Sequence, residues 1–107
     1  MVEQSINYDN LFRALADATR RDILARVAEK DLSISSLAKP YTMSFAAIAK
    51  HVSVLELAKL ITKRRVGKEQ IISAAPRTIN QATKYLEVYE KTWNGRFDAL
   101  ENLLKNK

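Results

Sequence analysis

The sequence predicts a mostly α-helical fold with one small β-hairpin, and three observations support this prediction. Apolar residues recur at helical spacing through most of the chain. One segment, residues 60–74, is instead rich in Ile, Thr and Val, with Gly67 near its middle. From Pro76 onward an apolar repeat continues almost to the end of the chain, which predicts one long helix.

Composition limits the classes of protein to which the chain can belong. Its 107 residues fit a single domain, 1–107, which buries only about two-thirds of the surface of its unfolded chain and gains stability by dimerising. The absence of cysteine excludes a disulfide scaffold, a thiolate nucleophile and a cysteine zinc site. No stretch approaches the roughly 20 apolar residues of a membrane span. We therefore expect a soluble cytoplasmic protein with no membrane partner and no cofactor.

Four helices are expected in the first half of the chain. The apolar spacing places them at about residues 8–16, 18–30, 34–39 and 44–58, and Pro40 ends the third of them. A short polar residue that can accept backbone N–H bonds precedes each of the last three. These candidate N-caps are Asp17, Ser33 and Ser44.

A β-hairpin is expected next, over about residues 60–74. Its arms are rich in Ile, Thr and Val, and the only glycine of the first 94 residues, Gly67, supplies the positive φ of a tight turn. The hairpin is also basic, and its cations are Lys63, Arg64, Arg65 and Lys68. We interpret it as a positively charged wing.

A long helix of about residues 76–105 is expected to follow, with Pro76 at its first position. Its apolar seam is about 42 Å long, too long for so small a domain to cover alone. Gly95 marks a candidate kink or break in this helix. The seam predicts a homodimer that the first helix helps to join. The expected interface residues are Leu11, Tyr89, Trp93, Phe97, Leu100 and Leu104.

Positive charge is concentrated in the middle of the chain. The net charge is +6, and residues 32–76 hold seven bases against two acids. Residues 1–31 have five bases and six acids, and residues 77–107 have a net charge of +2. A basic region between near-neutral ends indicates either a surface that meets a polyanion such as nucleic acid or a solvated lysine-rich face.

The helix of about residues 44–58 has two distinct faces. One is aliphatic, whereas the other is small, polar or basic and lets the backbone approach another surface closely. Together with the short helix before it and the basic hairpin after it, this helix predicts a winged helix-turn-helix with an added dimerisation helix. We expect it to enter the major groove of double-stranded DNA, with the wing on the phosphate backbone. The expected DNA contacts are Ser44, Phe45, Ala46, Ala49, Lys50, His51, Ser53, Arg64, Arg65 and Lys68.

At these positions the chain resembles the ArsR/SmtB-type transcriptional regulators. The run LFRALADATRRDIL, residues 11–24, is similar to the family's opening signature, and residues 43–58 are similar to its recognition-helix signature. Residues 89–104 are similar to the C-terminal helix of a branch without the usual metal-binding cysteines. The resemblance covers roughly residues 11–104. It implies a dimeric repressor that binds a palindromic operator and releases it in response to a signal.

The chain departs from the family pattern at four positions. Ala18 stands where proline is frequent, which costs little because alanine favours helices. Lys59 stands where glycine usually ends the recognition helix, so we expect left-handed geometry at a less favourable residue or a different turn. Phe45 and Ala49 replace polar residues that often touch bases. We therefore expect modest direct readout and some reliance on DNA shape.

Several residues have a second interpretation. Phe45 either contacts a base or packs against Tyr41, and we favour packing. His51 is expected to contact a phosphate or a helix cap, because a lone histidine cannot build a metal site. The aromatic part of the seam is expected to form a packed dimer core; a pocket for an unknown apolar small-molecule effector between subunits is the alternative.

Two other functions remain as alternatives. One is a protein-interaction module that has lost its DNA role, since the groove face is rich in alanine. The other is a metal-responsive repressor that uses only oxygen and nitrogen ligands, with carboxylates near both ends of the chain as candidate oxygen ligands. No enzymatic activity is expected, because the sequence offers no Ser, His and acid set and no paired catalytic carboxylates.

Overall fold

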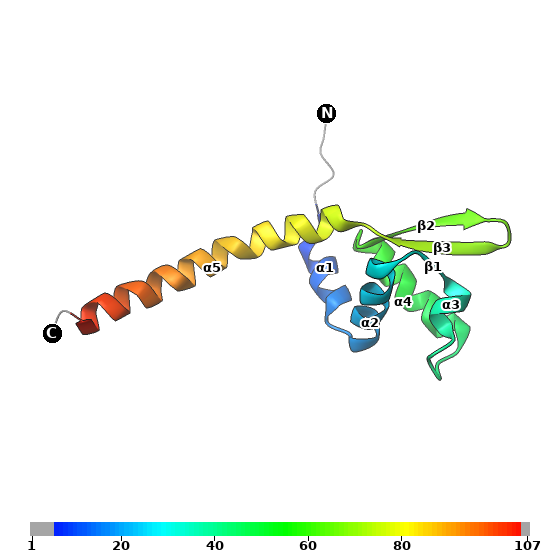
Figure 1. Ribbon diagram of the computed structural model, residues 1–107, viewed down its shortest axis with the longest axis horizontal. Coiled ribbons are helices and arrows are strands. Elements are labelled where there is room, and N and C mark those ends of the chain that lie inside the picture. Colours follow the sequence, from blue (N-terminus) through cyan, green and yellow to red (C-terminus); the bar gives the residue numbers. More distant parts are fainter. Residues whose placement is uncertain (1–5, 106–107) are drawn as a thin grey trace, which may run out of the picture.

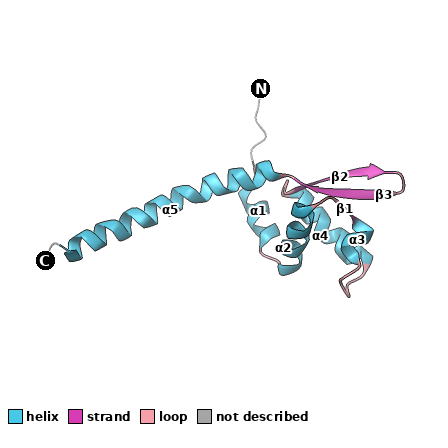
Figure 2. Ribbon diagram, viewed as in Figure 1, coloured by secondary structure: helices cyan, strands magenta, loops and turns pink. Residues whose placement is uncertain are grey.

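The computed structural model describes residues 6–105, which form five helices and a three-stranded sheet (Figure 1; Figure 2). The prediction of a mostly helical winged helix-turn-helix fold is confirmed. The strand β1, of two residues, is too short to leave a signal in the sequence and was not expected. The elements in chain order are α1 (Tyr8–Leu15), α2 (Ala18–Glu29), β1 (Leu32–Ser33), α3 (Ile34–Ala38), α4 (Phe45–Leu57), β2 (Ile61–Val66), β3 (Glu69–Ala74) and α5 (Pro76–Lys105).

Side-chain caps fix where the helices begin, and the three expected N-caps are confirmed. Each accepts a hydrogen bond from the backbone N–H three residues later, at 3.0 Å for Asp17 and at 3.1 Å for Ser33 and Ser44. Asn7 caps α1 in the same way at 3.0 Å, which the sequence analysis did not identify. These bonds satisfy amides that have no partner within their helix.

The last turn of α4 closes in the left-handed geometry that the sequence suggested. Lys59 has a φ of 62°, and its N–H donates to the carbonyl of Glu56 at 2.9 Å. The N–H of Leu60 donates to the carbonyl of Leu55 at 3.1 Å, and both leucine side chains are completely buried. This pair of bonds is a Schellman motif, formed here without its usual glycine. It turns the chain directly from α4 into β2.

The sheet has the order β1-β3-β2, and all its pairs are antiparallel. In the hairpin, Ile61 lies opposite Ala74 and Val66 lies opposite Glu69. Gly67 turns the chain with a φ of +63°, as expected from the sequence. Because side chains alternate along a strand, Ile61, Lys63 and Arg65 share the face of β2 that packs against the core, whereas Arg64 lies on the other face.

The hydrophobic core lies between α1, α2, α3, α4 and the inner face of the sheet. Its completely buried side chains include Leu11, Ile23, Leu37, Ile48, Val52, Leu55, Leu60 and Ile72. Within the described residues, α5 contributes only Thr78 and Ala82 to the buried set, both from its first two turns. The rest of this helix takes no part in the core.

Helix α5 therefore projects from the domain (Figure 1). It runs for 30 residues and continues through Gly95, so the candidate break there is absent. The radius of gyration is 18.7 Å, whereas a compact domain of this length has about 13 Å. Most of the projecting part of α5 therefore packs against no other element of the protomer.

Candidate nucleic-acid interface

The outward face of α4 is the surface at which DNA contact is expected. The opposite face is aliphatic, and its residues Ile48, Val52 and Leu55 are completely buried. On the outward face Ala49 is half-buried, and Ala46, Lys50 and Ser53 are exposed. At the start of the helix Ser44 and Phe45 are exposed as well, although Phe45 precedes Ile48 by three positions and so continues the aliphatic stripe. We call these six residues the α4 strip; apart from the large ring of Phe45 it consists of two alanines, two serines and Lys50.

Phe45 does not pack against Tyr41, so the interpretation favoured by the sequence is wrong. Its side chain is 55% exposed. The hydroxyl of Tyr41 instead donates a hydrogen bond to Asp22, and the guanidinium of Arg26 lies 5.6 Å from the centre of its ring. Phe45, at the start of α4, is therefore more than half exposed while Tyr41 is held by α2.

His51 lies beside the strip, at the contact between α4 and the start of α2. Its Nδ1 is 3.3 Å from Nη1 of Arg20 and 3.9 Å from a carboxylate oxygen of Asp17, and its side chain is 21% exposed. Of the two expected roles, a phosphate contact or a cap contact, the structure brings His51 to the cap residue Asp17. His51 thereby ties the recognition helix to α2.

The Asp17 carboxylate is stabilised in its charged form. The backbone N–H of Arg20 is the main cause that lowers the pKa of Asp17 below its ordinary value of 3.8. A smaller effect of burial opposes this shift, and the nearby charges of Arg20 and His51 lower the pKa further. The cap is therefore strongest when Asp17 is ionised.

Stability is expected to fall in acid as Asp17 takes up a proton. Because the folded-state pKa lies below 3.8, this contribution is fully present above the ordinary pKa and is lost as the pH falls through the folded-state value. Asp17→Asn keeps a capping oxygen that does not titrate, so its stability should change less between about pH 5 and pH 2. Urea unfolding at each pH measures both proteins, and parallel profiles would contradict this account.

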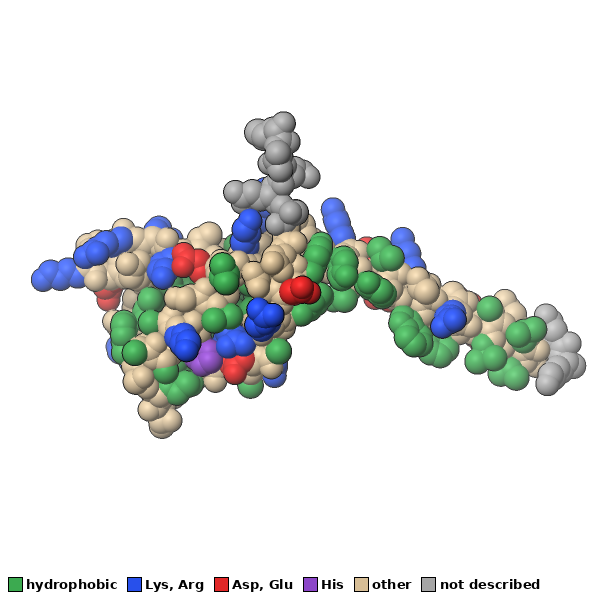
Figure 3. Space-filling model, turned by 180° about the vertical axis from the view of Figure 1, so that it is seen from behind, with side chains coloured by type: hydrophobic (Ala, Val, Ile, Leu, Met, Phe, Trp, Pro, Cys, Tyr) green, Lys and Arg blue, Asp and Glu red, His purple; other side chains and the backbone are tan. Residues whose placement is uncertain are grey.

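Positively charged side chains gather on the outer part of the hairpin (Figure 3). Lys63 of β2 forms an ion pair with Glu56 of α4, with 3.4 Å between Nζ and Oε1. This pair holds the base of the wing against α4, a link that the sequence analysis missed. Arg65 lies on the same face of the strand as Lys63, and Lys68 lies in the exposed turn. Lys68 has no ion pair within residues 6–105.

Arg64 is held within the protomer more firmly than its neighbours. Its Nη1 donates to Ser73 Oγ at 2.8 Å, and both Nη atoms lie 3.3 Å from a carboxylate oxygen of Asp31. By contrast, the guanidinium of Arg65 is bonded within residues 6–105 only at Nε, which donates to the carbonyl of Gly67 at 3.1 Å. Arg64 and Arg65 were both expected to contact DNA, but the structure shows that only Arg65 keeps most of its guanidinium unbonded within residues 6–105.

The arginines of α2 hold the ends of other helices. Arg20 donates from Nε to the carbonyl of Ala14 at 2.9 Å, and Arg21 donates to that of Leu15 at 2.7 Å. Arg26 donates to the carbonyl of Leu37 at 2.9 Å. These bonds satisfy carbonyls at the C-terminal ends of α1 and α3. The three arginines of α2 are therefore used within the fold.

The apolar seam of α5 is uncovered in the protomer. Figure 3 shows hydrophobic side chains along one side of the projecting helix. Five residues that were expected at a dimer interface are between 51% and 63% exposed: Tyr89, Trp93, Phe97, Leu100 and Leu104. The rings of Trp93 and Phe97 stack with their centres 6.1 Å apart. Leu86, at 50% exposed, continues the seam toward the domain.

Leu11 does not belong to this surface, so its expected place at the dimer interface is wrong. It is completely buried in the core of the protomer, because its side of α1 faces α2 and α4. The adjacent Phe12 is 39% exposed instead. Its ring lies 6.2 Å from that of Tyr85 on α5, and Tyr85 stacks on Tyr8 at 4.1 Å. An aromatic cluster thus joins α1 to α5 next to the seam.

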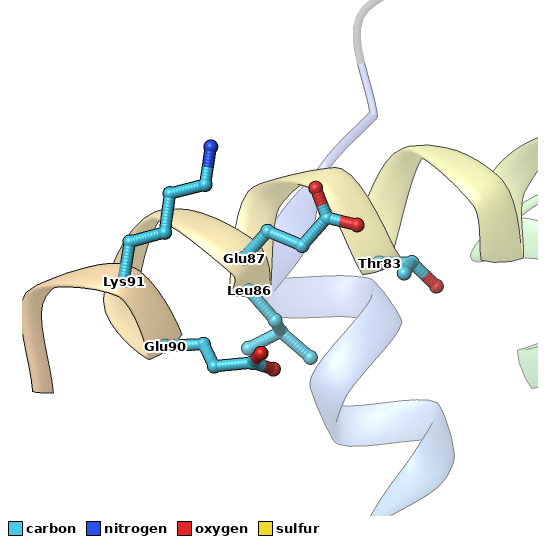
Figure 4. Close-up of a pocket in the computed structure, with 5 residues that line it drawn as sticks. All are labelled: Thr83, Leu86, Glu87, Glu90 and Lys91. Atoms are coloured by element: carbon cyan, nitrogen blue, oxygen red, sulfur yellow. The ribbon is translucent and has the colours of Figure 1, made fainter. Parts of the chain in front are cut away.

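A hollow of about 390 Å³ lies along α5, lined by Thr83, Leu86, Glu87, Glu90 and Lys91 (Figure 4). All five residues come from one helix, so nothing opposite them closes over a ligand. Within the described residues, no three His, Asp or Glu side chains come together to hold a metal ion. None of the helices formed by residues 6–105 is long and apolar enough to cross a membrane.

Known regulators resemble this chain in sequence and in structure, although no family model matches it. It is 43% identical over 74 residues to the uncharacterized HTH-type transcriptional regulator YuzN of Bacillus subtilis, covering 62% of this chain and 79% of that protein. It is 32% identical over 60 residues to the transcriptional repressor SdpR of the same organism, covering 56% and 67%. An ArsR-like transcriptional regulator from Rhodococcus sp. RHA1 has a TM-score of 0.76 at 34% identity, covering 89% and 90%.

The α3–α4 pair and the β2–β3 wing, together with these relatives, define a winged helix-turn-helix transcriptional regulator and not an enzyme. The chain belongs to the ArsR/SmtB family of these regulators. It contains no cysteine, as in the branch that the sequence resembles.

Proposed function

We propose that the chain is a homodimeric repressor that binds a palindromic operator, with α4 in the major groove and the wing on the phosphate backbone. The observation that carries this proposal is the division of the cations. Lys50, Arg65 and Lys68 present their charge at the surface, whereas the arginines of α2 bond groups inside the protomer. These three outward cations lie on the two elements that contact DNA in a winged helix-turn-helix.

Each element of the interface has a proposed role. The Ser44 side chain caps α4, and the N-terminal end of this helix favours a phosphate nearby. Lys50 contacts a guanine edge or a phosphate, and Ser53 faces the groove. Arg65 and Lys68 contact the backbone. Arg64 contributes less because of its bonds to Asp31 and Ser73.

The proposed dimer is formed by the seam of α5, with Phe12 in place of Leu11. A two-fold axis through this seam repeats α4 and the wing, so the two half-sites should lie about 34 Å apart, one turn of DNA. The relative SdpR is named a repressor, which favours repression over activation. We place the protein in the cytoplasm, where bacterial DNA is transcribed.

We assign the aromatic stripe to a packed dimer core and not to an effector pocket. Trp93 and Phe97 stack on each other and are more than half exposed on the seam, which suits contact with a second copy of α5. The hollow in Figure 4 includes Leu86 of the seam but none of the aromatic residues. This assignment leaves the inducing signal without a site.

The salt dependence of DNA binding tests the proposed function. A dimer that neutralises on the order of eight phosphates should lose affinity with salt at a logarithmic slope of about −7. Fluorescence anisotropy at several salt concentrations measures the slope, and light scattering measures the mass. A slope near zero, or no binding, would contradict the proposal and favour the protein-interaction module.

A further inference from the structure

The exposed side chains in the first turns of α4 are mostly apolar, whereas helices that read bases in the major groove of DNA mostly expose hydrogen-bonding groups there. Phe45 is 55% exposed, Ala46 is exposed and Ala49 is half-buried, and all three lie on the α4 strip. Lys50 is the charged member of this strip. No bidentate side chain such as Asn, Gln or Arg occurs between Ser44 and Ser53.

The major groove offers one apolar group to such a surface. Guanine, adenine and cytosine present hydrogen-bond donors and acceptors there, whereas thymine adds a methyl group at C5. A phenyl ring or an alanine methyl gains nothing from a donor or an acceptor, and it desolvates that group without replacing its bond to water. Contact with a C5 methyl buries apolar surface on both sides.

The charges around the strip favour DNA as its occupant over an apolar protein surface. Lys50 lies on the strip itself, and the Lys63–Glu56 ion pair anchors the basic wing beside the last turns of α4. Phe45 is in the first turn of the helix, the part that contacts base edges in helix-turn-helix proteins. DNA can therefore contact Lys50 and the basic wing through its phosphates while its major groove contacts the ring of Phe45.

We propose that Phe45, Ala46 and Ala49 read the C5 methyl groups of pyrimidines. The regulator then distinguishes thymine from uracil, and 5-methylcytosine from cytosine, at the same operator positions. This inference rests on the proposed function, because it requires DNA in contact with α4. It makes cytosine methylation within the operator a modification that the protein detects.

Replacing single thymines by deoxyuridine tests the proposal, since the change removes one methyl and leaves base pairing intact. On an operator selected from random DNA, the substitution at a contacted position should weaken binding about fourfold in one half-site. Made in both half-sites, it should weaken binding about fifteenfold. Placing 5-methylcytosine instead of cytosine at that position should strengthen binding by a similar factor.

Two variants assign the effect to the start of α4. In Phe45→Ala the uracil penalty at the contacted position should largely disappear. In Leu57→Ala it should remain, because Leu57 is an exposed apolar residue of the same helix about 18 Å farther along its axis. Equal affinity for thymine and uracil operators, or an undiminished penalty in Phe45→Ala, would overturn the inference. Failure of the proposed function would differ, since no operator would then bind.

Discussion

Replacing Trp93 by glutamate is expected to convert the dimer into a folded monomer that binds its operator at least about a hundredfold more weakly. Trp93 is 56% exposed in the protomer, so a second copy of α5 can bury about half of its large surface. The two-fold axis places the substitution twice in one seam, where two carboxylates would replace two indole rings. Burial of unpaired carboxylates is costly, and the dissociation constant of the dimer should rise on the order of a thousandfold.

The protomer itself should stay folded in this variant. Its core draws on α5 only at Thr78 and Ala82, far along the helix from Trp93. Light scattering and circular dichroism measure mass and helix content, and anisotropy measures operator affinity. Asn102→Glu is the matched control because it adds the same charge on the opposite side of α5, roughly 180° away. A Trp93→Glu protein that stays dimeric would contradict the assignment of the seam.

Removing Arg65 and Lys68 together is expected to weaken operator binding on the order of a hundredfold, through loss of phosphate contacts. A dimer would lose four such contacts, so the logarithmic salt slope should become less negative by about 3.6. Specificity should change little, since backbone contacts carry no sequence information. Anisotropy at several salt concentrations gives both the affinity and the slope.

Arg64→Ala provides the comparison within the same hairpin. Because Arg64 already bonds Ser73 and Asp31, its removal should change the salt slope by less than the removal of Arg65 or of Lys68. Lys84→Ala with Lys91→Ala removes two exposed cations from α5 and should leave the slope unchanged. If the Arg65→Ala, Lys68→Ala protein has the same salt slope as the wild type, the wing does not contact DNA.

Local features of the fold were predictable from the sequence because short-range chemistry determines them. The caps at Asp17, Ser33 and Ser44 depend on a side chain and an amide three residues apart. The positive φ at Gly67 follows from a two-residue hairpin turn, and the positive φ at Lys59 follows from the end of α4. The outward face of α4 follows from helical periodicity alone.

The errors concern contacts between elements distant in sequence. Leu11 and Phe12 are adjacent apolar residues of one helix, and only the packing of α1 decides which of them faces the core. Arg64 bonds Asp31, which lies 33 positions away, so the hairpin sequence by itself could not separate Arg64 from Arg65. The contacts of Tyr41 with Asp22 and Arg26 of α2 depend in the same way on tertiary structure, and so does the exposure of Phe45.

Selection of random-sequence DNA by the purified protein, followed by sequencing and with the mass in solution recorded alongside, tests the central claim most directly. The account predicts that a dimer enriches an inverted repeat whose half-site centres lie about 10 base pairs apart. Salt-sensitive binding without enrichment would contradict operator recognition and indicate a shape reader. No binding at any salt concentration would contradict the account as a whole.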